Sequence, residues 1–420
     1  MKHPLLLTLG ALLLAAGCTP PAPETVSTPW WKGNLHTHSL WSDGDDYPEM
    51  IMDWYKQGGY HFMALSDHNI LAEGEKWVTL SQARNGRVAF QKYLDRFGDD
   101  GVTWKVEGAD TLVRLKTLDE YRPLFEEAGT FLIIQAEEIT DEAEGKSVHV
   151  NATNLRELIP PQGGSTVREA MQNNVDAVLD QRRRTGQPMF PHINHPNFGW
   201  SVTAEDLIAL HGERFFEVYN GHPAVHNEGD SLRPSTERMW DIILTERLAH
   251  GEEVLYGIAI DDAHAYHEVT SELSNPGRGW VMVRAAELTP DALIAAMEAG
   301  DFYGSSGVTL LDIQQDDSSL RLEIEPEEGV TYTTQFIGTR QGYDPSSEPI
   351  ASTEIDAAFV TRRYSDDIGV VLAEVEGTSP SYTFSGDEIY VRARVISSTI
   401  KANPYRQGEY ETAWTQPVVR

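Results

Sequence analysis

Seven short apolar segments that end in histidine or in polar and acidic residues constrain the fold of this chain more than any other feature. Each has the length and hydrophobicity of a buried strand: residues 33–38, 61–68, 131–138, 147–153, 189–195, 215–220 and 254–264. Segments with helical periodicity lie between them at residues 47–59, 165–186 and 236–251, and each is closed by glycine. Seven strands separated by helices predict an α/β fold with a parallel sheet or barrel. In such barrels the active site lies at the carboxyl ends of the strands, where these histidines and acids occur.

Two regions depart from this alternating pattern. Residues 70–130 form a long connection with helical patches of its own. Because connections of this length are usually functional, a lid over the site is one interpretation, and a packed helical insertion is the other. After residue 307 alternating segments such as 319–325, 331–338 and 388–397 predict a small all-β, sandwich-like domain. We therefore predict an α/β domain at 31–307, with the insertion, and a β domain at 308–420.

The composition excludes one class of partner. The chain has 65 acidic and 33 basic residues and a formal charge of −32. No nucleic acid is expected as a stable partner, because phosphate backbones are bound by clustered lysine and arginine. The three arginines at 182–184 are interpreted as a solvated helix face. An anionic small-molecule substrate must therefore be attracted locally, by metal ions or a few arginines.

The first 18 residues have the features of an export signal, with a short basic start, an apolar run and a small-residue end. They resemble a bacterial lipoprotein signal peptide, in which Cys18 becomes the acylated first residue and residues 19–30 form a flexible tether. An ordinary signal peptide with a chance cysteine is the alternative. The resemblance implies lipid anchoring in the bacterial cell envelope, at the outer membrane or the periplasmic face, and Thr19 favours the outer membrane. Because Cys18 is the only cysteine, no disulfide is expected within the chain.

Two histidines one residue apart begin a series of metal-ligand side chains. Residues two apart on a strand face the same side, so His36 and His38 can bind one ion together. The series continues with Asp43, His68, Glu137 or Glu138, His149, His195, Asp262 and His264. Imidazole and carboxylate groups without thiolate suit Zn, Mn or Fe. Nine such groups exceed what one ion binds, so we predict two or three divalent metal ions, a cluster typical of hydrolases.

The motifs "LHTHSLWSDG", "ALSDHN", "HINHP" and "DDAH" together resemble the PHP superfamily, the polymerase and histidinol phosphatase group of metal-dependent hydrolases. The resemblance covers residues 31–306 and implies a distorted seven-stranded barrel. The segments "GRGWVMVRA" and "YGSSGV", followed by a β domain, resemble the exported branch that includes carbaryl hydrolase.

The resemblance also implies a role for each residue of the series. The first metal ion would be bound by His36, His38, Glu138 and Asp262, the second by Glu138, His149 and His195, and the third by Asp43, His68 and His264. Glu138 and Asp262 are therefore the predicted catalytic carboxylates. The family usually has Gly-x-Glu before the bridging carboxylate, whereas this chain reads "QAEEIT", which leaves Glu137 as an alternative to Glu138.

Other residues are weaker candidates. Arg278 is predicted to bind an anionic group, because a guanidinium matches the geometry of phosphate, and a structural arginine that closes a turn is the alternative. His192 is interpreted as a residue that packs behind the ligands. Three loop histidines are candidates for contact with the substrate, with a solvated loop as the default interpretation: His222, His226 and His267. Three tryptophans are candidates for lining a pocket, with core packing as the default: Trp77, Trp104 and Trp200.

Three functions remain compatible with these residues. The first is an exported metal-dependent hydrolase that cleaves a phosphoester of a small anionic substrate. The second uses the same centre on a carbamate or amide, which needs only one hydroxide and one Lewis-acid contact. The third is a metal-braced binding module, against which the complete ligand set argues. We favour phosphoester hydrolysis, because it uses every part of the predicted site.

Overall fold

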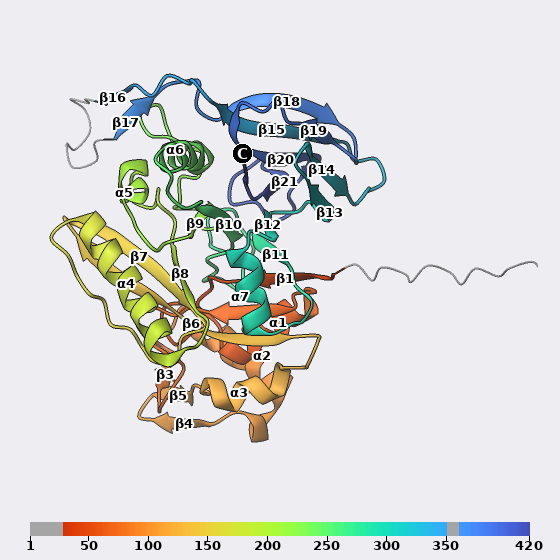
Figure 1. The fold of residues 1–420 in the computed structure, drawn as a ribbon. Coiled ribbons are helices and arrows are strands. Elements are labelled where there is room, and N and C mark those ends of the chain that lie inside the picture. Colours follow the sequence, from red (N-terminus) through yellow and green to blue (C-terminus); the bar gives the residue numbers. More distant parts are fainter. Residues whose placement is uncertain (1–27, 351–360) are drawn as a thin grey trace, which may run out of the picture.

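The computed structural model describes residues 28–350 and 361–420 (Figure 1). The predicted lipoprotein signal, Cys18 and residues 19–27 of the predicted tether lie outside the described residues. Of the helices within those residues, none is both long and apolar enough to span a bilayer. The drawing shows an α/β part, coloured red to green, beside a β-rich part in blue.

All seven predicted strands are present and lie side by side in one sheet, in the order β10-β9-β8-β7-β6-β2-β1. Their bounds are β1 (Trp30–Asn34), β2 (Phe62–Leu65), β6 (Leu132–Ala143), β7 (Lys146–Thr153), β8 (Phe190–Ile193), β9 (Phe215–Asn220) and β10 (Tyr256–Ile260). Every residue of β2, β8, β9 and β10 is buried. Burial on both faces explains why these segments are mostly apolar and do not alternate with polar residues.

The prediction of a parallel sheet is wrong for β7. Neighbouring strands are parallel at β1–β2, β2–β6, β8–β9 and β9–β10, but β7 runs antiparallel to both β6 and β8. The cause is the two-residue turn between β6 and β7, where Glu144 and Gly145 have φ of 56° and 71°. Positive φ at both central residues is the geometry of a tight β-hairpin. The sheet is therefore mixed, within an α/β architecture.

The first and last strands of this series meet just beyond their ends. The N–H of His38 donates to the carbonyl of Ala263 at 2.9 Å, and the N–H of Asp262 donates to the carbonyl of His36 at 3.0 Å. This contact is an isolated parallel bridge between Thr37 and Ala263 and not a ladder between β1 and β10. A closed seven-stranded barrel therefore stays a prediction.

The three predicted helices are confirmed as α1 (Pro48–Gln57), α4 (Val167–Thr185) and α6 (Thr236–Ala249), and two shorter helices are α5 (Ala204–Ile208) and α7 (Pro290–Glu298). Local signals explain the ends of α4. The Thr166 side chain accepts the N–H of Glu169 at the start, and Gly186 ends the helix with φ 69°. The apolar face of α4 packs against the sheet in the main hydrophobic core.

The connection at 70–130 is a small unit with its own sheet and core. It contains β3 (Trp77–Thr79), α2 (Gly86–Phe97), a 3-10 turn (Asp99–Gly101), β4 (Trp104–Glu107), β5 (Asp110–Arg114) and α3 (Leu118–Phe125). The strands pair in the order β3-β5-β4. Trp41, from the loop after β1, packs in this core and donates its Nε1–H to the carbonyl of Lys116 at 3.1 Å. The unit is thereby attached beside the segment that carries His36 and His38.

Every element described after α7 is a strand. The bounds are β11 (Trp280–Arg284) before α7, and then β12 (Phe302–Ser305), β13 (Leu310–Gln315), β14 (Ser319–Ile324), β15 (Tyr332–Arg340), β16 (Ser347–Pro349), β17 (Arg362–Tyr364), β18 (Val370–Glu376), β19 (Ser381–Thr383), β20 (Glu388–Ile400), β21 (Tyr410–Thr415) and β22 (Val418–Val419). A separate sheet, β13-β14-β19, shares a buried core with β15 and β20.

The two parts are joined through backbone and side chains. β11 and β12 extend the first sheet from β1, and β12 pairs with β21, so the sheet continues without a break past residue 307. Arg392 of β20 donates from Nε and Nη2 to the two carboxylate oxygens of Asp241 in α6, at 2.8 Å each. The domain boundary at 307 stays a prediction.

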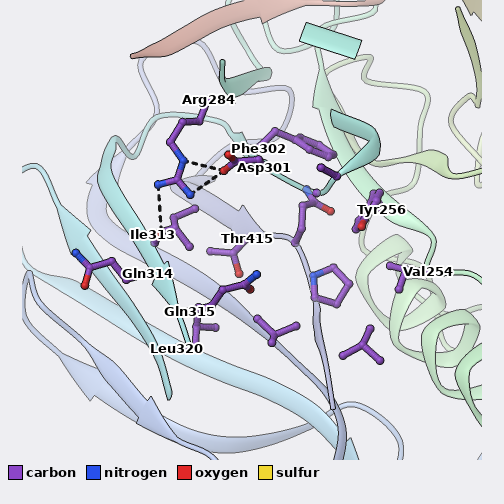
Figure 2. Close-up of a pocket in the computed structure, with 16 residues that line it drawn as sticks. Val254, Tyr256, Arg284, Asp301, Phe302, Ile313, Gln314, Gln315, Leu320 and Thr415 are labelled. Atoms are coloured by element: carbon purple, nitrogen blue, oxygen red, sulfur yellow. Dashed lines mark hydrogen bonds and ion pairs between the residues drawn. The ribbon is translucent and has the colours of Figure 1, made fainter. Parts of the chain in front are cut away.

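A cavity of about 640 Å³ lies where the two parts meet, lined by residues from β11, β12, β13 and the segment 415–419 (Figure 2). Arg284 in this cavity is paired with Asp301 at 2.7 Å and with Asp312 at 2.8 Å. No residue of the predicted metal site lines the cavity. We therefore place the candidate site elsewhere.

Candidate metal centre

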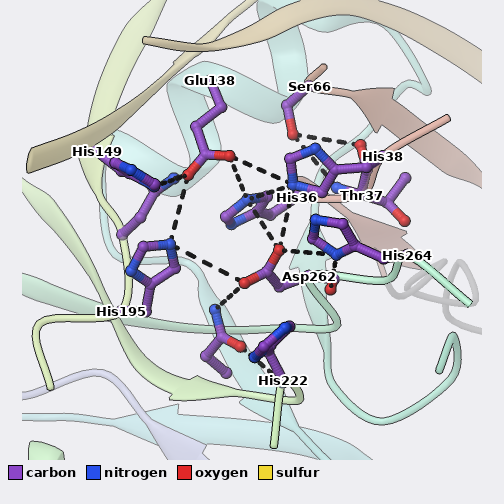
Figure 3. Close-up of polar contacts among 12 residues, drawn as sticks. His36, Thr37, His38, Ser66, Glu138, His149, His195, His222, Asp262 and His264 are labelled. Atoms are coloured by element: carbon purple, nitrogen blue, oxygen red, sulfur yellow. Dashed lines mark hydrogen bonds and ion pairs between the residues drawn. The ribbon is translucent and has the colours of Figure 1, made fainter. Parts of the chain in front are cut away.

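The predicted ligands meet in one pocket of about 560 Å³. Seven of the nine line it: Asp43, His68, Glu138, His149, His195, Asp262 and His264. The other two, His36 and His38, are fully buried beside Glu138 and Asp262 (Figure 3). Segments that are far apart in the sequence thus contribute to a single site at the carboxyl ends of β1, β2, β8 and β10, with Glu138 and His149 inside the β6–β7 hairpin.

The innermost group contains His36, His38, Glu138 and Asp262. The Nε2 atoms of the two histidines are 3.1 Å apart. Oε2 of Glu138 lies 3.3 Å from each of these nitrogens. Oδ1 of Asp262 lies 3.3 Å from Nε2 of His36 and 3.2 Å from Nε2 of His38. The side chains predicted for the first ion therefore converge on one point.

The other predicted groups lie on either side of this centre. Oε1 of Glu138 is 2.8 Å from Nδ1 of His149 and 3.4 Å from Nε2 of His195. At the more open side, Asp43 is 3.6 Å from Nε2 of His68 and 3.4 Å from Nε2 of His264. Nδ1 of His68 also lies 2.9 Å from Oε2 of Glu138. The predicted groups are thus contiguous, with Glu138 between them.

The chemistry of these donors fits divalent cations. The set contains only imidazole nitrogen and carboxylate oxygen, which are suitable ligands for Zn, Mn and Fe. Nδ1 of His38 is buried and forms no hydrogen bond with the described residues. Burial and the nearby His264 lower the pKa of His38 to about 3, so its imidazole is neutral and has a lone pair for a metal.

Glu137 and Glu138 point to opposite faces of β6. Glu138 faces the histidines, whereas Oε1 of Glu137 accepts the N–H of Ile159 at 2.7 Å. Burial raises the pKa of Glu137 to about 8, so this carboxyl group holds its proton near neutral pH. The geometry therefore favours Glu138 for the bridging role that the sequence left open between the two residues.

Glu217 in β9 is a site residue that the sequence analysis missed. Its Oε1 accepts a hydrogen bond from Nδ1 of His36 at 2.6 Å and lies 3.2 Å from Nε2 of His192. Its Oε2 accepts the N–H of His195 at 2.7 Å and Nδ2–H of Asn220 at 2.8 Å. The bond at Nδ1 directs Nε2 of His36 to the centre. A glutamate inside the apolar run "FFEVYN" was the available signal, because a buried carboxylate needs partners.

Two further histidines lie near the centre without being predicted ligands. His192 is fully buried behind His36, in agreement with a packing role. His222 lines the pocket, and its Nδ1 accepts the N–H of Ala224 at 3.1 Å. Burial lowers the pKa of His222 to about 4, so the ring is neutral with its proton on Nε2.

The structure contradicts the prediction that Arg278 binds an anionic group. Its side chain is fully buried, and Nη1 and Nη2 donate to the carbonyls of Gly221, Leu273 and Thr270 at 2.9, 2.6 and 2.8 Å. Nε and Nη2 donate to Oδ1 of Asn403 at 3.2 Å. A guanidinium whose donors all bind protein oxygens has none left for a substrate. Arg278 instead holds the pocket wall at 270–273 against the β-rich part.

The remaining aromatic and loop candidates lie outside the pocket lining. His226 stacks on Trp200 with ring centroids 4.4 Å apart, and His267 contacts the backbone of Asp45. Trp77 and Trp104 lie on the small sheet of the insertion. None of these four candidate side chains or Trp200 is among the residues that line the pocket.

The insertion contributes a different residue to the pocket. Arg84, between β3 and α2, lines the wall and donates from Nη2 to the carbonyl of His264 at 2.5 Å. The insertion therefore contacts the site, as the lid interpretation requires.

No family model and no curated protein matches the chain. Among solved structures, a two-domain protein from Bacteroides vulgatus with a predicted PHP-like metal-dependent phosphoesterase is 14% identical, with 91% of this chain and 94% of that chain covered and a TM-score of 0.38. A candidate metal-dependent phosphoesterase from Bifidobacterium adolescentis is also 14% identical, with coverage of 58% and 92% and a TM-score of 0.28. An amidohydrolase from Chromobacterium violaceum, with bound sulfate and no metal, is 12% identical, with coverage of 58% and 90% and a TM-score of 0.30. These similarities are too low to assign a family.

Proposed function

We propose that this protein is a metal-dependent hydrolase of the PHP superfamily and that it cleaves phosphoesters of small molecules. The observation that supports this most is the convergence of nine histidine and carboxylate side chains, Glu138 and Asp262 at their centre, at one pocket that seven of them line. These donors are more than one ion binds. A centre of two or three ions suits the attacking oxygen, the leaving oxygen and the nonbridging oxygens of a phosphoryl group.

In this proposal the chain's residues position the ions and the substrate. The ions would be held by His36, His38, Asp43, His68, Glu138, His149, His195, Asp262 and His264, and when bound they would supply a hydroxide nucleophile and neutralise the phosphoryl charge. Asn194 Nδ2–H donates to Oε1 of Glu138 at 2.7 Å, and Asn220 Nδ2–H donates to Oδ2 of Asp262 at 3.1 Å. These bonds orient the two carboxylates. His222 offers a neutral Nε2–H to a substrate oxygen.

The second candidate is hydrolysis of a carbamate or amide at the same centre. Phe198, Pro223 and Leu273 give the pocket apolar wall surface that suits an uncharged organic group. The net charge of −32 also slows the approach of a free anion and favours a neutral substrate. The full ligand set argues against this candidate, because two or three metal ions would supply more positive charge than an uncharged carbamate or amide requires.

A substrate panel tests the choice between them. We expect metal-loaded protein to hydrolyse an aryl phosphate mono- or diester, a chelator to abolish turnover, and Mn or Zn to restore it, because the ions supply the nucleophile. Release of the aryl alcohol is followed by absorbance. If fully loaded protein cleaves an aryl carbamate and no phosphoester, the second candidate replaces the first.

We also propose that the mature protein is lipid-anchored in a bacterial envelope through Cys18. The support is the sequence alone: an apolar run that ends in "LAAGC" and contains the single cysteine of the chain. We expect mass spectrometry of the mature protein to find an acylated Cys18 at the amino terminus. Cleavage beyond Cys18 would contradict the proposal.

A further inference from the structure

The pocket wall beyond the nine predicted ligands has a single permanent positive charge. Its charged or titratable members are Arg84, His222 and Glu272, and the described wall contains no lysine. His222 is neutral, as its bond from the Ala224 N–H shows. Arg84 is therefore the wall residue that can attract an anion.

Arg84 is held on a fixed support. Its Nη2 donates to the carbonyl of His264 at 2.5 Å, and its Nε lies 3.5 Å from Oδ2 of Asp45. Asp45 is itself buried and accepts hydrogen bonds from Asn85 Nδ2 at 2.9 Å and from the N–H of Tyr266 at 2.8 Å. The Arg84 side chain is still 48% exposed, so part of the guanidinium remains open to the pocket. A guanidinium fixed in this way presents its free donors in one orientation.

Another part of the pocket wall carries the aromatic ring of Phe198. The Phe198 ring lies 5.1 Å from the His195 ring and 6.0 Å from the His222 ring. Figure 3 shows His195 and His264 on opposite sides of Asp262; Phe198 lies beside His195, whereas Arg84 bonds the backbone of His264. A ligand that contacts both residues meets a cation at Arg84 and an aromatic ring at Phe198.

We propose that Arg84 is the anion-binding residue of the pocket and that the substrate is an organic phosphate monoester whose apolar group lies against Phe198. This inference rests on the proposed phosphoesterase function. Arg84 donates to a nonbridging phosphoryl oxygen, which carries more negative charge in a monoester than in a diester. The insertion thereby selects the substrate, while the ions and their ligands act on the scissile bond.

Two substitutions of Arg84 and one matched control test the proposal. We expect Arg84→Ala to raise the KM for 4-nitrophenyl phosphate about tenfold with kcat within about twofold, because a charge-assisted hydrogen bond is lost from binding. Arg84→Lys should recover part of the loss, since it keeps the charge but not the fork of donors. Arg87→Ala, on the exposed first turn of α2 and away from the pocket lining, should match the native enzyme. Metal content should be equal in all four proteins.

Binding of inorganic phosphate separates failure of this inference from failure of the proposed function. Calorimetry of metal-loaded protein should show phosphate binding that is about tenfold weaker in Arg84→Ala, whether or not any ester is turned over. If native protein binds phosphate and hydrolyses no phosphoester, the proposed function fails while the assignment of Arg84 stands. Equal phosphate affinity in the native and Arg84→Ala proteins overturns the assignment, and so does native protein that binds no phosphate.

Discussion

Glu138→Gln is expected to lower the metal content of the purified protein and to reduce turnover by more than about 100-fold. This loss exceeds the roughly 10- to 100-fold effect of substituting a residue that only hydrogen-bonds to a metal ligand. The glutamine has the same shape but carries no charge and offers one oxygen where the carboxylate has two. Both oxygens are used: Oε1 faces His149 at 2.8 Å, and Oε2 faces His36 and His38 at 3.3 Å. Elemental analysis after dialysis and a turnover assay measure the two effects.

The adjacent Glu137 provides the control for this experiment. Both glutamates are fully buried and lie on the same strand, but Glu137 bonds the N–H of Ile159 instead of the centre. Because burial raises the pKa of Glu137 to about 8, Glu137→Gln replaces a protonated acid by an amide of similar shape. We expect it to keep metal content and activity. Loss of metal in Glu137→Gln but not in Glu138→Gln would show that the bridging residue was misassigned.

Glu217→Gln is expected to weaken metal binding about 10- to 100-fold, which is the usual cost of removing a charged partner of a metal-bound histidine. Glu217 touches no predicted ion site directly and acts through His36, whose Nδ1 lies 2.6 Å from Oε1. The carboxylate fixes the proton on Nδ1 and strengthens Nε2 as a ligand, whereas an amide accepts the same bond without the charge. Titration of the metal against a competing chelator gives the affinity directly.

A buried glutamate two residues before β9 provides a control that distinguishes an effect on the metal site from a general loss of stability. Glu213 is also fully buried, and its Oε1 accepts the N–H of Phe215, remote from the pocket lining. Glu213→Gln should leave the metal affinity unchanged, and Glu217→Asp should recover part of the affinity because the charge is kept. A specific role also predicts altered nitrogen chemical shifts for the His36 ring in Glu217→Gln. Equal losses of affinity in the Glu213 and Glu217 variants would contradict it.

The presence of the seven strands and the candidate ligand residues could be read from local patterns. His36 and His38 face one side because the side-chain period of a strand is two residues, and this holds wherever the strand packs. The buried runs at β2 and β10 contain no charged residue, so their burial on both faces was encoded locally. The direction of β7 was missed because it depends on the turn conformation at Glu144 and Gly145, which a strand pattern does not contain.

The sequence by itself determined which side chains stand at the strand ends, since residue type and two-residue periodicity are local properties. Only the tertiary structure decided their partners. Glu217 bonds His36, which is 181 positions away in the sequence, and thereby orients a predicted ligand. Arg278 bonds Asn403, which is 125 positions away, and thereby stabilises the pocket wall. The fold of the insertion brings Arg84 to the pocket wall. Hydrogen bonds and ion pairs act over a few ångströms, and distances of that size between remote segments exist only once the chain has folded.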